Sequence, residues 1–96
     1  MKTRANFPLQ ALNSLNVPAV TAEILFPSTV KELFEINTDK ALRSYILGEG
    51  TNTLFCQAKA PTIIKPSLMG IEVTEHDECF QVSAACGENW HNLVLF

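Results

Sequence analysis

Two glycines separated by one residue follow an apolar segment near the middle of the chain. Residues 45–47 lead directly into residues 48–53, Gly-Glu-Gly-Thr-Asn-Thr. Glycine permits positive φ angles, so successive backbone amides can turn toward one ligand, and clustered amides bind anions. One interpretation is a loop whose amides, with the Thr51 hydroxyl and the Asn52 side chain, cradle a pyrophosphate. The other is a structural turn that binds nothing, and these residues alone favour it, because Gly-x-Gly is common in turns.

Two common nucleotide-binding motifs do not fit this loop. The dinucleotide fingerprint requires a third glycine where Thr53 stands, followed by a helix, whereas residues 54–56 continue as an apolar strand. The P-loop requires Gly-Lys-Ser/Thr, which is absent. Glu49 must point away from a bound phosphate or bind a hydroxyl group, because its charge opposes the phosphate charge.

Other residues that often carry chemistry are scattered along the chain. Cys56, Cys79 and Cys86 are odd in number and fit neither a disulfide framework nor paired zinc ligands. Neither histidine belongs to a metal-binding pair, so we predict no metal site and assign no catalytic residue. Cys56 and Cys86 are expected to be small buried residues, and all three thiols to be reduced in a cytoplasmic protein.

The composition describes a small globular chain. Its 96 residues are 47% hydrophobic and 18% charged. One domain at most is expected, with a folded surface of ~5,500 Å² out of ~15,400 Å² for the unfolded chain. The net charge is −3 and the basic residues are dispersed, so nucleic-acid binding is not expected. The longest apolar run is the final four residues, so neither export nor membrane spanning is expected.

The first half of the chain predicts a strand, a helix and a second strand. Residues 1–19 have no period and read as an irregular leader, and residues 20–25 read as a strand. The spacing of Thr29 and Glu32 predicts a helix start with an apolar face, followed by a polar break at residues 37–40. Residues 44–47 complete the unit, and we expect its two strands to be parallel.

The second half predicts short strands and the beginning of a helix. Residues 54–57 and 62–65 read as strands separated by a turn at 58–61. Residues 71–84 alternate around an acidic turn, which is typical of an antiparallel hairpin with a solvated tip. A helix is predicted after Glu88, with Trp90 in the core. It lacks stop signals, so we expect the chain to be a piece of something longer.

Four blocks of sequence together resemble a known family. Residues 46–55, 62–64, 70–73 and 85–94 occur in the order and spacing of the UDP-N-acetylenolpyruvoylglucosamine reductases, flavoenzymes that make UDP-N-acetylmuramate for bacterial peptidoglycan. The chain resembles the N-terminal end of these enzymes over residues 9–96. The Gly-Glu-Gly-Thr-Asn and Gly-Glu-Asn-Trp-His blocks are more specific together than either is alone. Another flavin oxidase of the superfamily is not expected to share the second block.

The resemblance implies an α/β (α+β) fold of the vanillyl-alcohol oxidase/p-cresol methylhydroxylase type, in which two subdomains enclose FAD. After the leader, residues 20–65 would form the first FAD-binding subdomain, and residues 66–96 would begin the second. The family's pyrophosphate-binding loop and its neighbours map onto eight residues as cofactor-binding: Leu47, Gly48, Glu49, Gly50, Thr51, Asn52, Thr53 and Leu54.

The sequence departs from the family pattern in two places. The Asn-Thr-Phe-Gly leader of the family corresponds to residues 13–16, where Leu15 replaces the aromatic residue and Asn16 the glycine. Asparagine tolerates a left-handed backbone, which limits the effect of the second change. The Gly-Ala pair that often precedes Gly-Glu-Asn-Trp is Ala85-Cys86 here.

The resemblance implies hydride transfer from NADPH to FAD and then to UDP-N-acetylglucosamine enolpyruvate in the complete enzyme. The family's catalytic side chains lie beyond Phe96, so we expect the chain alone to be inactive and to bind FAD weakly or not at all. Exposed apolar residues 90–96 would favour self-association. The alternative from another class is a non-catalytic binding module or remnant, in which the glycine turn is purely structural.

Overall fold

The computed structural model describes residues 1–50 and 53–96. It has mixed helix and strand content, which confirms the coarse α+β prediction. Along the chain, the elements are β1 (Lys2–Pro8), the 3-10 helix η1 (Gln10–Leu12), β2 (Val20–Phe26), α1 (Val30–Glu35), α2 (Thr38–Leu42), β3 (Tyr45–Ile46), β4 (Lys59–Ala60), β5 (Ile63–Ile64), β6 (Ile71–Glu75), β7 (Phe80–Ala84) and α3 (Trp90–Leu95).

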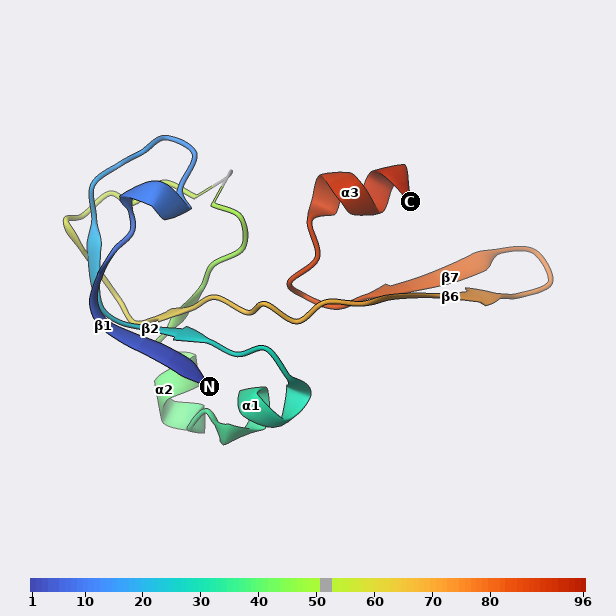
Figure 1. The fold of residues 1–96 in the computed structure, drawn as a ribbon, viewed down its shortest axis with the longest axis horizontal. Helices are drawn as coiled ribbons and strands as arrows, with labels where there is room; N and C mark the ends of the chain where they lie inside the picture. Colours follow the sequence, from blue (N-terminus) through green and yellow to red (C-terminus); the bar gives the residue numbers. More distant parts are fainter. Residues whose placement is uncertain (51–52) are drawn as a thin grey trace.

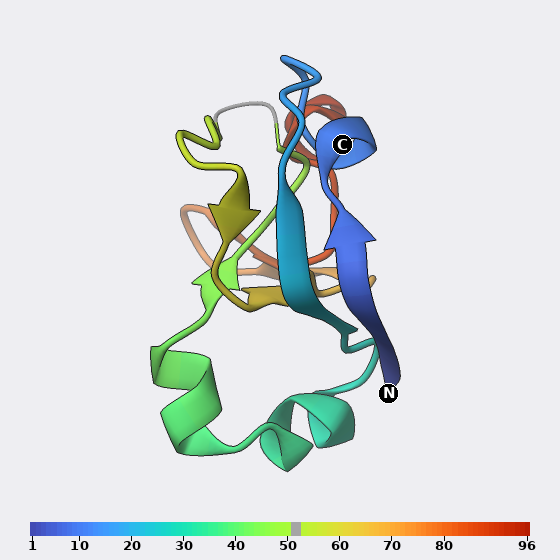
Figure 2. The ribbon, with the colours of Figure 1, turned by 90° about the vertical axis from the view of Figure 1, so that its left-hand side faces the viewer.

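The main sheet has the strand order β1-β2-β5-β3, with β4 also paired to β2 (Figures 1 and 2). The edge strand β1 is antiparallel to β2, and the other pairs are parallel. The predicted strands at residues 20–25 and 44–47 therefore exist as β2 and β3. They do not pair with each other, because β5 lies between them and is parallel to both.

A small core lies against this sheet. Its buried members are Leu9, Ala19, Ile24, Leu47 and Ile63. They come from the turn after β1, from β2, from the end of β3 and from β5, so the core joins segments that are far apart in sequence. Leu47 belongs to this core and directly precedes Gly48, so its burial anchors the chain between β3 and the glycine loop.

The prediction of an irregular leader was wrong for its first part. Residues 2–8 form β1, which pairs with β2 from Lys2 opposite Phe26 to Pro8 opposite Val20. The Phe7 and Phe26 rings also meet edge to face at 5.9 Å between centroids. No apolar alternation marks β1, because an edge strand is stabilised by its neighbour's backbone as much as by its own side chains.

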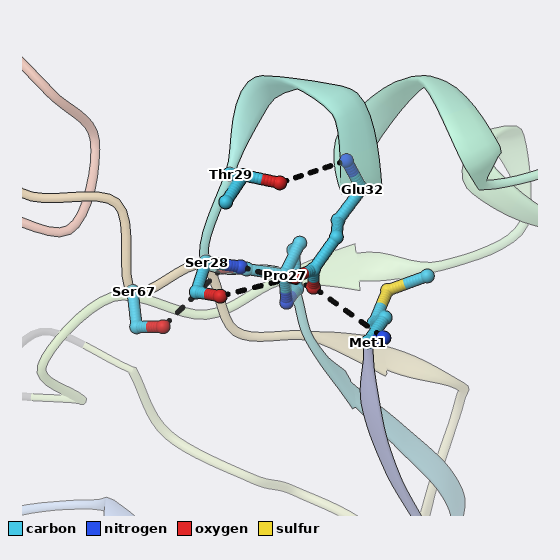
Figure 3. A network of polar contacts seen from close by, with 6 residues as sticks. All are labelled: Met1, Pro27, Ser28, Thr29, Glu32 and Ser67. Carbon is cyan, nitrogen blue, oxygen red and sulfur yellow. Dashed lines mark hydrogen bonds and ion pairs between the residues drawn. The ribbon is translucent and has the colours of Figure 1, made fainter.

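The predicted start of α1 is confirmed. The Thr29 hydroxyl accepts a hydrogen bond from the Glu32 amide at 3.1 Å. The Glu32 carboxylate reaches back to the Ser28 amide and hydroxyl and forms an ion pair with the N-terminal amine of Met1 at 3.6 Å (Figure 3). The side chain thus satisfies donors before the helix and ties α1 to the start of β1.

Several local predictions differ from the structure. Residues 37–40, predicted as a polar break, begin α2, because the Asn37 side chain caps the Asp39 amide at 2.8 Å. Residues 54–57, predicted as a strand, have no strand pairing, and the predicted turn at 58–61 contains β4. The apolar face of α1 is uncovered, since Phe34 is 85% exposed.

The C-terminal third of the chain forms a hairpin and a short helix. β6 and β7 pair antiparallel from Ile71 opposite Ala84 to Glu75 opposite Phe80, as predicted. α3 begins where predicted, with the Asn89 side chain accepting from the Asn92 amide at 2.9 Å. Trp90 is 75% exposed, so its predicted core position was wrong: no described element covers this helix face.

The chain exposes more surface than a compact protein of its size. Its accessible area is 7031 Å², compared with the ~5,500 Å² expected from its mass. Its radius of gyration is 15.4 Å, compared with about 12.5 Å for a compact chain of this length. Figure 1 shows the reason, since the hairpin and α3 extend away from the main sheet. Within the described ranges, no helix is long and apolar enough to cross a membrane.

A buried hydroxyl group in β2 provides a test of this sheet. Thr21 is fully buried, and its Oγ1 lies 2.7 Å from the carbonyl oxygen of Pro61, just before β5. Replacing Thr21 by valine keeps the shape and leaves that carbonyl unsatisfied, so we expect a loss of about 1–2 kcal/mol in the free energy of unfolding. Urea denaturation followed by circular dichroism measures it.

The matched control is Thr3→Val in the neighbouring strand β1, where the side chain is exposed. We expect a change within about 0.5 kcal/mol for this variant. Equal unfolding free energies for both variants would contradict the proposed role of the Thr21 hydroxyl.

Candidate functional site

The glycine loop begins where two parallel strands end side by side. The Tyr45 amide donates to the Thr62 carbonyl and the Leu47 amide to the Ile64 carbonyl, both at 2.9 Å. This register places Gly48 beside the residues that follow β5. In parallel α/β sheets, ligands bind beyond the carboxyl ends of the strands, so the sheet presents this loop at a position suited to binding.

The loop is held by its carbonyl groups. The Gly50 carbonyl accepts from the Ser14 amide at 3.1 Å, and the Gly48 carbonyl accepts from Lys65 Nζ at 2.6 Å. By contrast, the amides of Gly48, Glu49 and Gly50 donate to no other residue that the structure describes. The contacts that fix the loop therefore leave these donors for a ligand or for water.

The two glycines have different roles. Gly50 has a φ of 76°, and a Cβ atom there would lie 1.9 Å from the Leu12 carbonyl oxygen. Packing against the backbone of Leu12 therefore requires glycine at this position. Gly48 has no positive φ, and a Cβ atom there would meet nothing within 4 Å. We expected both glycines to provide positive φ for a ligand. Only Gly50 does so, while Gly48 borders the open space.

A buried asparagine shapes the segment that packs against Gly50. The Asn13 side chain donates to the carbonyls of Leu9 and Val17 at 2.9 and 3.1 Å and accepts from the Val17 amide at 2.9 Å. Asn16 adopts a φ of 53°, in the left-handed region that asparagine tolerates, as expected. The leader thus forms an ordered support beneath the loop.

The remaining predicted binding residues fall into three groups. Thr51 and Asn52 lie outside the described residues. Leu47 is fully buried in the core, so only its backbone can face a ligand. Thr53 Oγ1 lies 3.3 Å from the Tyr45 hydroxyl, and Leu54 is exposed.

A concave surface of about 340 Å³ adjoins the end of the loop. Sequence reasoning missed it, because it read residues 54–57 as a strand. The volume is at the low end for small-molecule sites. Its lining includes Thr53 and Leu54 from the predicted site, together with Tyr45, Phe55, Cys56 and Lys59.

Sequence reasoning also missed Lys65 as a neighbour of the loop. Lys65 directly follows β5, and its ammonium group contacts the Gly48 carbonyl across 17 positions of sequence. The signal that could have identified it was the parallel pairing of residues 44–47 with 62–65, because parallel strands bring their carboxyl ends together.

Packing and helix capping account for two residues of the Gly-Glu-Asn-Trp-His block at residues 87–91. A Cβ atom on Gly87 would lie 2.5 Å from the Leu68 carbonyl oxygen, which also accepts from the Gly87 amide at 2.8 Å. Asn89 caps α3. Glu88 Oε2 is buried and has no hydrogen-bond partner among the described residues. The glycine and the asparagine of this block therefore have structural roles in this chain.

The cysteines and acidic residues form no metal centre in the described part of the chain. No group of three His, Cys, Asp or Glu side chains there is placed to hold a metal ion. Cys56, Cys79 and Cys86 are free and exposed. The expectation that Cys56 and Cys86 are buried was wrong, because Cys56 lies on an open concave surface and Cys86 in the uncovered C-terminal part.

The contrast between the two glycines gives a matched pair of variants. Gly50→Ala forces a side chain into the Leu12 carbonyl at a left-handed φ, so we expect a loss of about 2–4 kcal/mol in unfolding free energy. Gly48→Ala enters open space and should change it by less than about 0.5 kcal/mol. Urea denaturation measures both, and equal values would refute the packing role of Gly50.

Comparison with known proteins identifies relatives over most of the chain. UDP-N-acetylenolpyruvoylglucosamine reductase of Yersinia pestis is 34% identical over 89 residues, which are 90% of this chain and 26% of that protein. The Buchnera aphidicola enzyme of the same name is 35% identical over 100 residues, or 98% of this chain and 28% of that protein. The Idiomarina loihiensis enzyme is 46% identical over 50 residues, which are 52% of this chain and 15% of that protein.

No protein-family model matches the chain. The relatives nevertheless agree in name, and at 32–35% identity several cover nearly the whole of this sequence. The chain spans about a quarter of the length of these curated relatives. By this similarity, the chain belongs to the UDP-N-acetylenolpyruvoylglucosamine reductase family and corresponds to a fragment of such an enzyme.

Proposed function

We propose that this chain is the N-terminal, FAD-binding portion of a reductase that converts UDP-N-acetylglucosamine enolpyruvate to UDP-N-acetylmuramate with NADPH, a step of peptidoglycan biosynthesis. The observation that carries the proposal is the hydrogen bonding of residues 48–50. The carbonyls of Gly48 and Gly50 accept hydrogen bonds from the protein, whereas the amides of these residues donate to no described residue. The names of the relatives support the reaction.

The described residues fit the diphosphate of FAD. The donor set consists of backbone amides and one ammonium group, which favours an anion over a cation or an apolar group. Open space borders Gly48, where a ligand can approach the backbone. FAD, when bound, supplies the hydride chemistry. The residues of this chain bind and orient the cofactor, and we propose Leu47, Thr53 and Leu54 as its further neighbours.

We propose two subdomains and a cytoplasmic location. Residues 20–65 would be the first subdomain of a vanillyl-alcohol oxidase-type fold, and residues 66–96 the start of the second. The two separate sheets support this division, since β6 and β7 pair only with each other among the described strands. The free state of the three cysteines is in keeping with a reducing compartment.

The chain alone is proposed to be catalytically inactive. Its surface exceeds that of a compact protein of equal mass, and its concave surface is open, so a flavin ring would be incompletely enclosed. A half-formed site loses the desolvation and pre-organisation that give affinity.

Titration of FAD into the purified chain, followed by flavin fluorescence, tests the loop. We expect at most weak saturable quenching, with a Kd above about 10 μM. The Gly48→Val variant should abolish it, because the side chain enters the space beside the amides, where a Cβ atom meets nothing within 4 Å. Adding NADPH and substrate should give no oxidation above that with free FAD.

Two results would count against this proposal. Quenching that is equal in wild type and Gly48→Val would show that flavin binds elsewhere. Turnover of UDP-N-acetylglucosamine enolpyruvate by the chain alone would show that the catalytic groups are present within these residues.

A second candidate function is an interaction module without catalysis. It is favoured by the exposed apolar side chains of the C-terminal part, where Trp90, Leu95 and Phe96 are each at least 70% exposed. Such patches promote association, and we propose that a second copy of the chain covers this one in solution.

Sedimentation velocity tests this association. We expect dimers or larger species at tens of micromolar concentration, and a weakening of about fivefold or more for Leu95→Lys, because a charge then enters the apolar contact. Gln10→Lys in η1 adds the same charge at an exposed position outside this apolar surface, so it is the control and should change little. A monomer at the highest soluble concentration would exclude self-association through α3.

A further inference from the structure

Lys65 is fixed beside the glycine loop by both its backbone and its side chain. Its amide donates to the Leu25 carbonyl at 2.8 Å, which anchors the residue at the end of β5 against β2. Its Nζ atom donates to the Gly48 carbonyl at 2.6 Å. The ammonium group therefore sits at the loop as a result of strand register.

The charge of Lys65 is not neutralised by an ion pair in the described part of the chain. The two ion pairs there join Met1 to Glu32 and Lys40 to Glu23. An ammonium group has three donors, and the Gly48 carbonyl uses one of them. Two donors and the positive charge of Lys65 therefore remain without a described partner beside the Gly48 peptide.

We propose that Lys65 is a cofactor-binding residue that supplies the positive charge for the diphosphate held by the loop. The inference rests on the proposed function of the loop. Charge-assisted hydrogen bonds to phosphate are stronger than neutral ones, so an ammonium group adds affinity that amides alone do not provide.

Titration of inorganic pyrophosphate into the 96-residue chain, observed by ³¹P NMR at low salt, tests the proposal. Lys65→Gln keeps a donor for the Gly48 carbonyl and removes the charge, so we expect the Kd to rise about fivefold to tenfold and to depend less on salt. Lys65→Arg should retain most of the affinity. The matched control is Lys31→Gln on α1, an exposed lysine that belongs neither to the loop nor to the concave surface, for which less than about a twofold change is expected.

A measurement on the unaltered protein keeps the test independent of variant stability. The side-chain resonances of Lys65 should shift on addition of pyrophosphate, while those of Lys31 should not. Pyrophosphate binding that is equal in wild type and Lys65→Gln, with no shift at Lys65, would overturn the role of Lys65 and leave the loop as an anion site. No saturable binding by the wild type would overturn the loop's proposed function and the role of Lys65 with it.

Discussion

The candidate site depends on how the chain after β3 is held by its carbonyl oxygens. Ser14 binds the carbonyl of Gly50, and Lys65 binds that of Gly48, so each contact fixes the loop without using an amide of residues 48–50. The contact of Gly50 with the backbone of Leu12 sets the path of the chain between them. A turn that is stabilised through its acceptors can present its donors to an anion, so the structural role of this short segment is compatible with the binding role that we propose for it.

The rest of the molecule supports this loop unevenly. The core of the main sheet buries Leu47 directly before the loop, and the Asn13 side chain orders the segment that packs against it. The hairpin and α3, in contrast, extend from the sheet and leave large apolar side chains exposed. The proposed anion-binding loop therefore keeps its support in a chain that covers about a quarter of its relatives' length, while the concave surface beside it is open.

Local signals predicted the elements that local interactions stabilise. The start of α1 at Thr29 and the start of α3 before Trp90 carry their own capping hydrogen bonds. The β6–β7 hairpin carries its own alternation of apolar residues, and the structure confirms all three elements. β1 forms through pairing with a distant strand, and the exposure of Trp90 reflects a missing partner, so neither is encoded in nearby residues. For the same reason, the glycine loop was visible in the sequence, whereas its neighbour Lys65 required the register of two parallel strands.

The most direct measurement is the ¹H–¹⁵N spectrum of the labelled chain during titration with ADP and, separately, with adenosine. If the loop is an anion site, ADP shifts the amide resonances of Gly48, Glu49 and Gly50 together and saturably, while adenosine leaves them in place. Amide resonances of these three residues that are insensitive to ADP at millimolar concentration, or that respond equally to adenosine, would contradict a diphosphate-binding role and leave a structural turn.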